Sequence, residues 1–430
     1  MRAMKDSGIE WIGEIPQEWD LQKIKSSFGI VAGATPKSGE ANYWDGDIPW
    51  VTPADYTTED VLISAGRKSI TPEGMGSCAT SLVPAGSLVF SKRAPVGLVA
   101  ISSNPLCTNQ GCLSCVPKEK VDAKYYYYVM SIYSEQFDLF ASGTTFKEIS
   151  ADAFANFKLP YPIFETQKKI AAYLDAKCAE IDALIAAKEK TNALLKERRQ
   201  SIIYEAVTKG LDPTVPMKDS GVEWIGEIPE GWEIAALKRL GTPATGSTPS
   251  KDNADYWGGD IPWVSSKDMK SDYLLDSEDH ITQSAIDECG LTLFAPGTLI
   301  FCVRSGILRH TFPVAVATLP VTINQDLRAL SLNGDVNPAF LLYYMRGMND
   351  TIVTLYQKIG ATVESIEMDW FLYFPVVLPA REEQDRIVEA LDSRCASLDQ
   401  TVKQNEATIR QLKEYRQSLI YEAVTGKIEI

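Results

Sequence analysis

Two segments of the chain, residues 165–208 and 382–425, contain neither glycine nor proline and carry apolar residues at alternating steps of four and three. Each segment follows a proline and ends just before a glycine, and these residues commonly mark helix boundaries. The spacing predicts two helices, each about 66 Å long at roughly 1.5 Å per residue. A helix of this length must bury an apolar stripe. Here the stripe continues over about four heptads, which is typical of a coiled coil.

The apolar positions of the two stripes define a predicted seam. Its residues are Leu174, Cys178, Ile181, Ile185, Leu195 and Ile202 in the first helix, and Leu391, Cys395, Leu398, Val402, Ile409, Leu412 and Leu419 in the second. Three polar residues interrupt the seam and are expected to fix its register, namely Lys188, Asn192 and Asn405. The simplest partner for each helix is the other one, which predicts an antiparallel coiled coil. The alternative is that each helix packs on its own domain.

The rest of the chain is rich in Gly, Pro, Thr and aromatic residues, and its apolar runs are short. Segments such as 87–90 and 298–303 lie between turn residues, which is typical of strands. These regions are predicted to form mixed, β-rich domains.

The chain is an internal repeat. Residues 4–19 return as residues 217–232 with 13 of 16 positions identical, and residues 196–208 return as residues 413–425 with 11 of 13 identical. The period of 213 to 217 residues (217 − 4 and 413 − 196) is too long for a solenoid and fits a duplicated domain.

The predicted fold class is therefore α+β, with two β-rich mixed α/β domains separated by two long helices in an antiparallel coiled coil. A pseudo-two-fold axis relates the two copies. The expected segments are a first domain at 1–160, a first coiled-coil helix at 161–210, a second domain at 211–378 and a second coiled-coil helix at 379–430.

The charge of the chain is acidic, with a formal net value of −15. Residues 1–160 carry 14 basic and 18 acidic side chains, and residues 211–378 carry 11 and 22. Domains that bind nucleic acid usually show a basic bias, so any contact with DNA has to be explained against this charge. No apolar run reaches eighteen residues and no signal-peptide pattern is present, so a soluble cytoplasmic protein with reduced cysteines is expected.

Residues that enzymes commonly use are scarce. The two histidines, His280 and His310, do not match across the copies, which leaves little for general-base or His-based metal chemistry. No phosphate-binding loop of the Gly-x4-Gly-Lys-Ser/Thr type is present. No catalytic site is predicted.

Three cysteines, Cys107, Cys112 and Cys115, are close enough in sequence to suggest a metal knuckle. The second copy has Leu327 and Leu330 where the first has Cys112 and Cys115. These positions are therefore expected to hold core thiols rather than metal ligands. Cys178 and Cys395 would lie near opposite ends of an antiparallel coiled coil, so no disulfide is expected between them.

Three motifs occur twice and in the same order. They are Trp-Ile-Gly-Glu-Ile-Pro at 11–16 and 224–229, Gly-x-Thr-Pro followed by Tyr-Trp-x-Gly-Asp-Ile-Pro-Trp at 33–50 and 246–263, and Pro-x4-Gln-x2-Ile at 162–170 and 379–387. Because these motifs occur twice in this order, the chain resembles the DNA-specificity subunit of type I restriction–modification enzymes over its whole length.

The resemblance implies two target-recognition domains, each reading one half of a split, asymmetric site in double-stranded DNA, with the coiled coil as spacer. It implies a non-catalytic subunit that binds two DNA adenine methyltransferase subunits, which restriction/translocase subunits then join. S-adenosylmethionine, ATP and magnesium would belong to those partners. The alternative is a duplicated coiled-coil adaptor that joins protein partners without binding DNA, which the acidic charge would suit better.

Residues that read different DNA words should differ while the frame persists. The copies diverge after Phe90 and Phe301, which predicts DNA-approaching loops there. Basic side chains in these loops and polar ones after the Gly-x-Thr-Pro turns are the candidate contacts: Lys92, Arg93, Arg304 and Arg309, and Lys37, Ser38, Ser250 and Lys251.

The near-identical helix ends at 200–208 and 417–425 suit two identical partner subunits, and Tyr204, Glu205, Tyr421 and Glu422 are the candidate contacts. Because neither domain is basic, the chain alone should bind DNA weakly, with methyltransferase subunits supplying much of the phosphate contact. The repeated tryptophans are expected in the core rather than as base-stacking platforms, namely Trp11, Trp44, Trp50, Trp224, Trp257 and Trp263.

Overall fold

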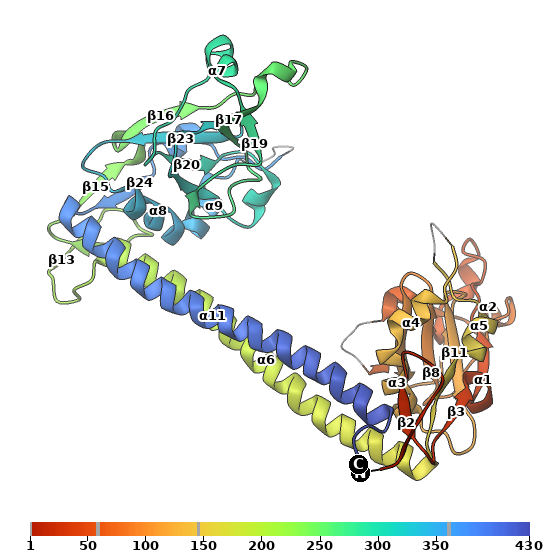
Figure 1. The fold of residues 1–430 in the computed structure, drawn as a ribbon. Coiled ribbons are helices and arrows are strands. Elements are labelled where there is room, and N and C mark those ends of the chain that lie inside the picture. The colour runs from red at the N-terminus through yellow and green to blue at the C-terminus, as the bar shows by residue number, and fades with distance from the viewer. Residues whose placement is uncertain (1, 57–60, 144–146, 359–362) are drawn as a thin grey trace. The chain divides into compact units, whose positions relative to one another are not determined.

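The computed structural model describes residues 2–56, 61–143, 147–358 and 363–430, and the chain forms two compact units. Unit 1 comprises Met1–Lys188 and Glu406–Ile430, and unit 2 comprises Glu189–Asn405. Each unit therefore contains one β-rich copy, one part of the helix α6 (Phe164–Lys209) and one part of the helix α11 (Arg381–Val424) (Figure 1).

Each unit is built around a five-stranded sheet of the same topology. In unit 1 the order is β4-β11-β8-β9-β6, and in unit 2 it is β16-β23-β20-β21-β18. The strands are β4 (Phe28–Ala32), β6 (Leu62–Ile63), β8 (Leu88–Lys92), β9 (Val96–Ser102) and β11 (Cys112–Pro117), with β16 (Gly241–Thr245), β18 (Tyr273–Leu274), β20 (Leu299–Cys302), β21 (Val314–Ala317) and β23 (Leu327–Leu332) as their counterparts.

A three-stranded sheet accompanies each five-stranded one, in the order β10-β5-β7 in unit 1 and β22-β17-β19 in unit 2. Its strands are β5 (Trp44–Val51), β7 (Lys68–Ile70) and β10 (Cys107–Thr108), and β17 (Trp257–Val264), β19 (Asp279–Ile281) and β22 (Thr322–Ile323). The outer strand pairs are β1 (Met4–Asp6) with β2 (Glu14–Pro16), β3 (Asp20–Lys23) with β12 (Lys158–Tyr161), β13 (Met217–Asp219) with β14 (Glu227–Pro229), and β15 (Glu233–Ala236) with β24 (Pro375–Leu378).

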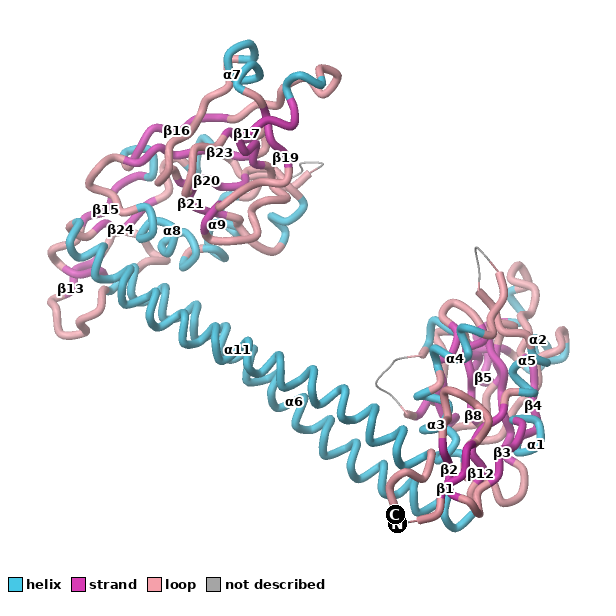
Figure 2. Tube along the Cα trace, viewed as in Figure 1, coloured by secondary structure: helices cyan, strands magenta, loops and turns pink. Residues whose placement is uncertain are grey.

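Short helices complete each unit. Unit 1 has α1 (Ile24–Ser27), α2 (Pro72–Gly76), α3 (Ala123–Ile132), α4 (Ser134–Leu139) and α5 (Ala151–Asn156). Unit 2 has α7 (Gln283–Cys289), α8 (Pro338–Gly347), α9 (Asn349–Tyr356) and α10 (Met368–Phe371). Figure 2 shows these helices around the strands of each unit.

The central strands explain how the core forms. Leu88 and Phe90 of β8 point into a large cluster that includes residues of α3, α6 and α11, whereas Val89 points into a smaller cluster on the opposite face. β20 repeats this alternation with Phe301 and Ile300. Because both faces are buried, the strand sequences are almost continuously apolar.

The two long helices lie side by side in each unit (Figure 1). Unit 1 contains the start of α6 and the end of α11, and unit 2 contains the end of α6 and the start of α11, so the pairing is antiparallel. Of the seam residues, Leu174, Cys178, Ile181, Ile185, Leu391, Cys395, Ile409 and Leu419 are buried, and Leu195, Ile202, Leu398, Val402 and Leu412 are half-buried. The predicted α+β fold with an antiparallel coiled coil is confirmed.

Polar contacts between the helices define the register. The Nδ2 of Asn405 donates to the Oδ1 of Asn192 over 2.8 Å, and both side chains are buried. Arg199 pairs with Asp399 (Nε–Oδ1 3.3 Å) in unit 2. The equivalent residues of the other copy, Arg416 and Asp182, pair in unit 1 (Nε–Oδ1 3.0 Å). A shift of one heptad would keep the seam but place Asn192 opposite Leu398 or Leu412, and both asparagine amides would lose this hydrogen bond, which is unfavourable.

The repeated opening segment meets the repeated helix end of the other copy. In unit 1 the Tyr421 hydroxyl donates to the Ile12 carbonyl (3.0 Å), and in unit 2 the Tyr204 hydroxyl donates to the Trp224 carbonyl (3.1 Å). Each domain is thus held by the start of its own long helix and by the end of the other one. Packing on the domains and pairing with each other both occur, at different parts of the same helices.

A buried glutamine attaches the start of each helix to its domain and explains the Pro-x4-Gln motif. The Gln167 Oε1 accepts from the Asp122 backbone N–H (2.9 Å), and its Nε2 donates to the Pro162 carbonyl (2.8 Å). Gln384 repeats this arrangement with the Asn337 N–H (2.8 Å). A buried side chain with both ends bonded fixes the angle at which the helix leaves the domain.

We predict a strong coupling between Asn192 and Asn405. Leucine at either position alone leaves the other amide without this partner and should lower the free energy of unfolding by about 1–3 kcal/mol. Leucine at both positions should recover most of that loss, because no unsatisfied amide remains at this seam layer. Urea denaturation of the wild-type chain, the two single variants and the double variant gives the free energies of unfolding for a double-mutant cycle. Additive losses would contradict the prediction.

A second prediction concerns Gly426, where a Cβ would lie 2.4 Å from the Pro16 Cγ. Gly8 in the same unit has a similar positive φ (+71° against +72°) with no atom within 4 Å of the added Cβ. Gly8→Ala should therefore cost about 1–2 kcal/mol from backbone strain. Gly426→Ala should cost a further ~1–3 kcal/mol from overpacking. Equal losses in urea denaturation would show that the helix end is not packed on the opening segment.

Candidate nucleic-acid interface

The antiparallel strand order brings three loops of unit 1 to one end of its five-stranded sheet. Leu113 of β11 is opposite both Ala32 of β4 and Phe90 of β8, so β4 and β8 end beside the start of β11. We call residues 33–40, 92–95 and 109–111 the loop end of unit 1. All four residues predicted to contact DNA in this copy lie there.

Unit 2 has the same arrangement. Arg328 of β23 is opposite Thr245 of β16 and Phe301 of β20, so the following loops again share one end of the sheet. Residues 246–253, 303–309 and 324–326 form the loop end of unit 2. It contains the other four predicted DNA contacts.

Repeated tryptophans hold the first loop of each loop end. In unit 1, Trp50 and Trp44 donate their Nε1–H groups to the carbonyls of Ala34 (3.0 Å) and Lys37 (3.2 Å). In unit 2, Trp263 and Trp257 donate to the carbonyls of Ser247 and Ser250, each over 3.0 Å. The indole groups therefore fix the backbone of the loop while leaving its side chains to vary.

The expected burial of the six tryptophans holds in part. Trp50 and Trp263 are buried, whereas Trp11, Trp44, Trp224 and Trp257 are half-buried. Each of the half-buried rings packs on another aromatic ring, such as Trp11 on Phe157 and Trp224 on Phe374. These ring contacts account for their positions without a bound base.

A glycine makes the loop end possible in each unit. A Cβ on Gly33 would lie 2.0 Å from the Asn109 carbonyl oxygen, and one on Gly246 would lie 2.0 Å from the Ile323 carbonyl oxygen. No other residue permits this approach of two backbones. The glycine of the Gly-x-Thr-Pro motif is therefore required for packing.

Gln110 and Gln325 are not among the predicted site residues, although both are exposed at the loop ends. The Thr35 hydroxyl donates to Gln110 Oε1, and the Thr248 hydroxyl donates to Gln325 Oε1. The sequence could have indicated these glutamines, because the threonine and the glutamine both recur in the repeat. The two loop ends therefore have this glutamine amide in common, whereas their basic side chains differ.

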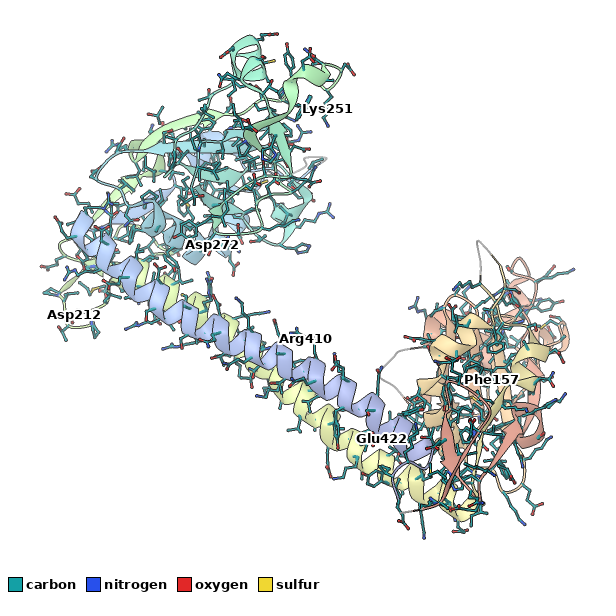
Figure 3. All side chains as sticks on the ribbon, viewed as in Figure 1. Phe157, Asp212, Lys251, Asp272, Arg410 and Glu422 are labelled. Carbon is teal, nitrogen blue, oxygen red and sulfur yellow. The ribbon has the colours of Figure 1, made fainter. Side chains whose placement is uncertain are left out.

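The predicted contacts in the first loops are exposed. Lys37, Ser38, Ser250 and Lys251 are all solvent-accessible. Figure 3 shows Lys251 at the part of unit 2 away from the long helices, whereas Asp212 lies beside them. These side chains are available to a ligand that approaches the loop end.

The basic side chains at the end of β8 are paired within unit 1. Lys92 Nζ lies 2.7 Å from Glu148 Oε1, and Arg93 Nη1 lies 3.5 Å from Glu148 Oε2. The Lys92 side chain is only 17% exposed and that of Arg93 is 34% exposed. Of the two, Arg93 is the more accessible.

The equivalent region of unit 2 also pairs its arginines. Arg304 Nε lies 3.9 Å from Asp326 Oδ1, and Arg309 forms an ion pair with Glu364. The hydrogen bond from Arg309 holds the pKa of the Glu364 carboxyl below its usual value. Both arginine side chains are more than 60% exposed, at 61% and 64%.

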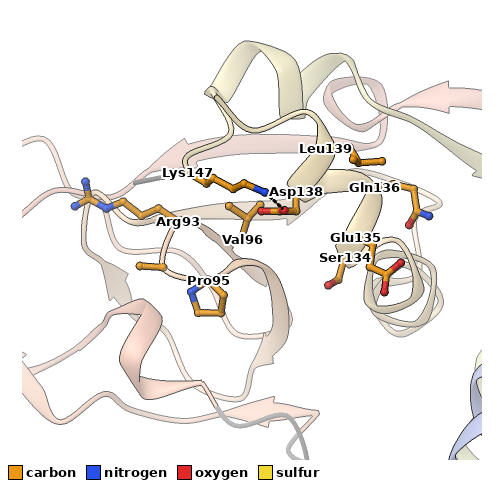
Figure 4. Close-up of a pocket in the computed structure, with 10 residues that line it drawn as sticks. Arg93, Pro95, Val96, Ser134, Glu135, Gln136, Asp138, Leu139 and Lys147 are labelled. Carbon is orange, nitrogen blue, oxygen red and sulfur yellow. Dashed lines mark hydrogen bonds and ion pairs between the residues drawn. The ribbon is translucent and has the colours of Figure 1, made fainter. Parts of the chain in front are cut away.

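A cavity of about 960 Å³ adjoins the loop end of unit 1, between the turn at 93–96 and α4. Figure 4 shows Lys147 and Asp138 joined across it, with Pro95, Val96 and Leu139 as apolar lining and the Arg93 guanidinium turned away. The Lys147 Nζ and Asp138 Oδ2 atoms are 2.5 Å apart. The lining thus mixes apolar and charged groups beside a predicted DNA contact.

The predicted partner-binding residues occupy two different environments. Tyr204 and Tyr421 are half-buried and bond to the opening segments, as described above. Glu205 is exposed and Glu422 is half-buried, and each accepts a hydrogen bond from a serine one turn earlier. Their contact with a partner remains a prediction, and Glu205 is the most accessible of the four.

The clustered cysteines lie in the core. Cys107, Cys112 and Cys115 are buried, and burial raises the pKa of the Cys112 thiol to about 12. Such a thiol stays protonated at neutral pH. Cys178 and Cys395 are free. The described parts of the chain contain no group of three or more His, Cys, Asp or Glu residues suited to a metal ion.

The loop ends, the repeat and the paired helices define a class of proteins with two recognition domains on a shared helical region. The family described as "Type I restriction modification DNA specificity domain" matches residues 16–196 and 229–413. The chain belongs to this family.

Curated relatives agree with this assignment. The chain is 29% identical to the type I restriction enzyme MjaIX specificity subunit of Methanocaldococcus jannaschii, over 97% of this chain and 95% of that protein. It is 28% identical to the EcoR124I/EcoR124II specificity subunit of Escherichia coli, over 65% and 64% of the two chains.

Solved structures show the same fold. A chain from a structural study of assembly and conformational transition of the type I R-M system aligns with a TM-score of 0.77 and 17% identity, covering 96% of this chain and 99% of that one. The HsdS subunit from Thermoanaerobacter tengcongensis aligns with a TM-score of 0.56 and 16% identity, covering 96% and 98%. Among the described residues, no helix is both long and apolar enough to cross a membrane.

Proposed function

We propose that this chain is the DNA-recognition subunit of a type I restriction–modification complex and that each unit reads one half of a bipartite, asymmetric DNA site. The observation that carries the proposal is the loop end, which occurs twice on one tryptophan-and-glycine frame with different basic residues. With this frame, each unit can present its own set of side chains to the DNA bases on the same backbone geometry. The family assignment supports the same function.

The long helices have a separate role in this proposal. Both are continuous from one unit into the other, so they set the spacing between the half-sites. Their repeated surfaces, including Glu205 and Glu422, would be met by two DNA adenine methyltransferase subunits, and restriction/translocase subunits would join that core. S-adenosylmethionine, ATP and magnesium would be used by those partners, and this chain would have no catalytic role.

A duplicated adaptor without DNA binding is less well supported. It would need the repeated helix ends, but it would not need two loop ends on one frame with different exposed arginines. It also fits less well with a chain that belongs to a DNA-specificity family. A gel shift on a bipartite site, with the methyltransferase partner present, separates the two functions.

We predict that Arg93→Ala and Arg304→Ala each change one half-site only. Loss of a guanidinium contact to a base edge should cost about 1–3 kcal/mol, which is roughly five- to 150-fold in affinity, and should relax base preference at one position. The measurement is a competition assay with duplexes altered in either half. Lys25→Ala and Arg239→Ala, at the opposite end of each five-stranded sheet, are the matched controls. Unchanged affinity and preference would remove Arg93 and Arg304 from the interface.

A further prediction follows from the net charge of −15. The isolated chain should bind cognate DNA at least about tenfold more weakly than its complex with methyltransferase subunits, because few phosphates are neutralised by this chain alone. Fluorescence anisotropy at one salt concentration, with and without the partner, tests this. Equally tight binding by the isolated chain would contradict it.

A further inference from the structure

Each basic side chain that is predicted to contact DNA at the end of a central strand forms an ion pair with a carboxylate of its own unit. Glu148 is shared by Lys92 and Arg93, and Glu364 pairs with Arg309. Glu148 and Glu364 both come from the segment that precedes the last short helix of their copy. This segment had no role in the interface predicted from sequence.

Backbone hydrogen bonds place Glu148 in unit 1. Arg93 and Glu148 form an antiparallel bridge, and the Ile149 N–H donates to the Lys92 carbonyl over 3.0 Å. The carboxylate is therefore held beside the turn by the main chain. A mobile surface side chain could make the same ion pair, but it would not be fixed in this way.

Unit 2 holds its carboxylate by a related pairing. Arg304 forms an antiparallel bridge with Ser365, and the Ser305 N–H donates to the Glu364 carbonyl over 3.0 Å. The Glu364 side chain is only 17% exposed, whereas that of Arg309 is 64% exposed. The carboxylate thus lies beneath the guanidinium, which remains accessible.

These pairs have two physical consequences. A neighbouring carboxylate cancels the long-range attraction between an arginine and phosphate, on which non-specific DNA binding depends. It also engages only part of the guanidinium, which has five N–H donors, so other donors remain to bond a base edge. Partly exposed ion pairs are weak enough for such an exchange.

We propose that Glu148 and Glu364 are specificity-determining positioning residues. Glu148 holds Lys92 and Arg93 in place, and Glu364 holds Arg309. Both carboxylates repel phosphate, so that binding is favoured only where a base presents hydrogen-bond acceptors to the arginine. This inference rests on the proposed function. In this inference the acidic residues act in selection. Specificity is a difference between two affinities, so weakening the binding of wrong sequences raises it as much as strengthening the binding of the right one.

The test uses Glu148→Gln and Glu364→Gln in the complex with methyltransferase subunits. Affinity is measured for a cognate duplex and for an unrelated duplex between 50 and 200 mM salt. Each variant should bind the unrelated duplex roughly three- to tenfold more tightly, with a salt slope steeper by about one, because one more cation is available to phosphate. The ratio of cognate to unrelated affinity should fall.

Matched controls are available in both units. Glu119→Gln follows the far end of β11 and Asp335→Asn follows the far end of β23, and both side chains are exposed. These variants should leave both affinities unchanged. Glu148→Asp keeps the charge and should retain most of the discrimination, and circular dichroism of every variant confirms folding.

The outcomes separate this inference from the proposed function. If the wild-type complex discriminates but Glu148→Gln and Glu364→Gln leave unrelated-duplex affinity and salt slope unchanged, the selective role is wrong and the proposed function stands. If the variants weaken binding to all duplexes equally with no change in slope, the glutamates only support the fold. A wild-type complex that binds every duplex alike overturns both proposals.

Discussion

The last turns of both long helices are buried against the opening segment that belongs to the other copy. Tyr421 bonds to Ile12 in unit 1 and Tyr204 bonds to Trp224 in unit 2, and Gly426 lies where a Cβ would strike Pro16. Neither copy can therefore complete its own domain with its own helix end in this arrangement. The duplication supplies the missing part, and antiparallel pairing follows, since each helix must start in one unit and end in the other.

This constraint separates the parts of the chain that must repeat from those that are able to change. The opening segment of each copy contacts the helix end of the other copy, so a change in one calls for a matching change in the other. The loop ends are supported by indole-to-carbonyl hydrogen bonds and a glycine contact, which involve backbone on the loop side. Side chains such as Arg93 and Arg309 are therefore replaceable without loss of the frame. Recognition of new sequences is compatible with a fixed scaffold for this reason.

Features with a local period could be predicted from sequence, and features made by distant pairing could not. The seam follows from heptad spacing, and the polar residues at Asn192 and Asn405 mark its register because a buried amide demands a partner. The candidate DNA contacts could be selected because the copies diverge there, and the strand order then places them at one end of each sheet. The pairing of Arg93 with Glu148 joins residues 55 positions apart (148 − 93) by a bridge that no local pattern announces. The helix-end tyrosines were selected as partner contacts because identity in a repeat does not distinguish an external surface from an internal one.

The acidity of the chain first argues against DNA binding, but it is consistent with DNA binding that has to be selective. Non-specific affinity scales with the number of phosphates that a protein neutralises, and a genome offers a vast excess of wrong sites. A subunit whose task is selection gains little from a basic surface, because that surface strengthens every wrong complex along with the right one. Arginines held beside carboxylates contribute mainly where a base edge replaces part of the intrachain contact. Charge and specificity are then two aspects of the same arrangement. In the domain with 22 acidic and 11 basic residues, the two arginines of the loop end, Arg304 and Arg309, each lie next to an acid.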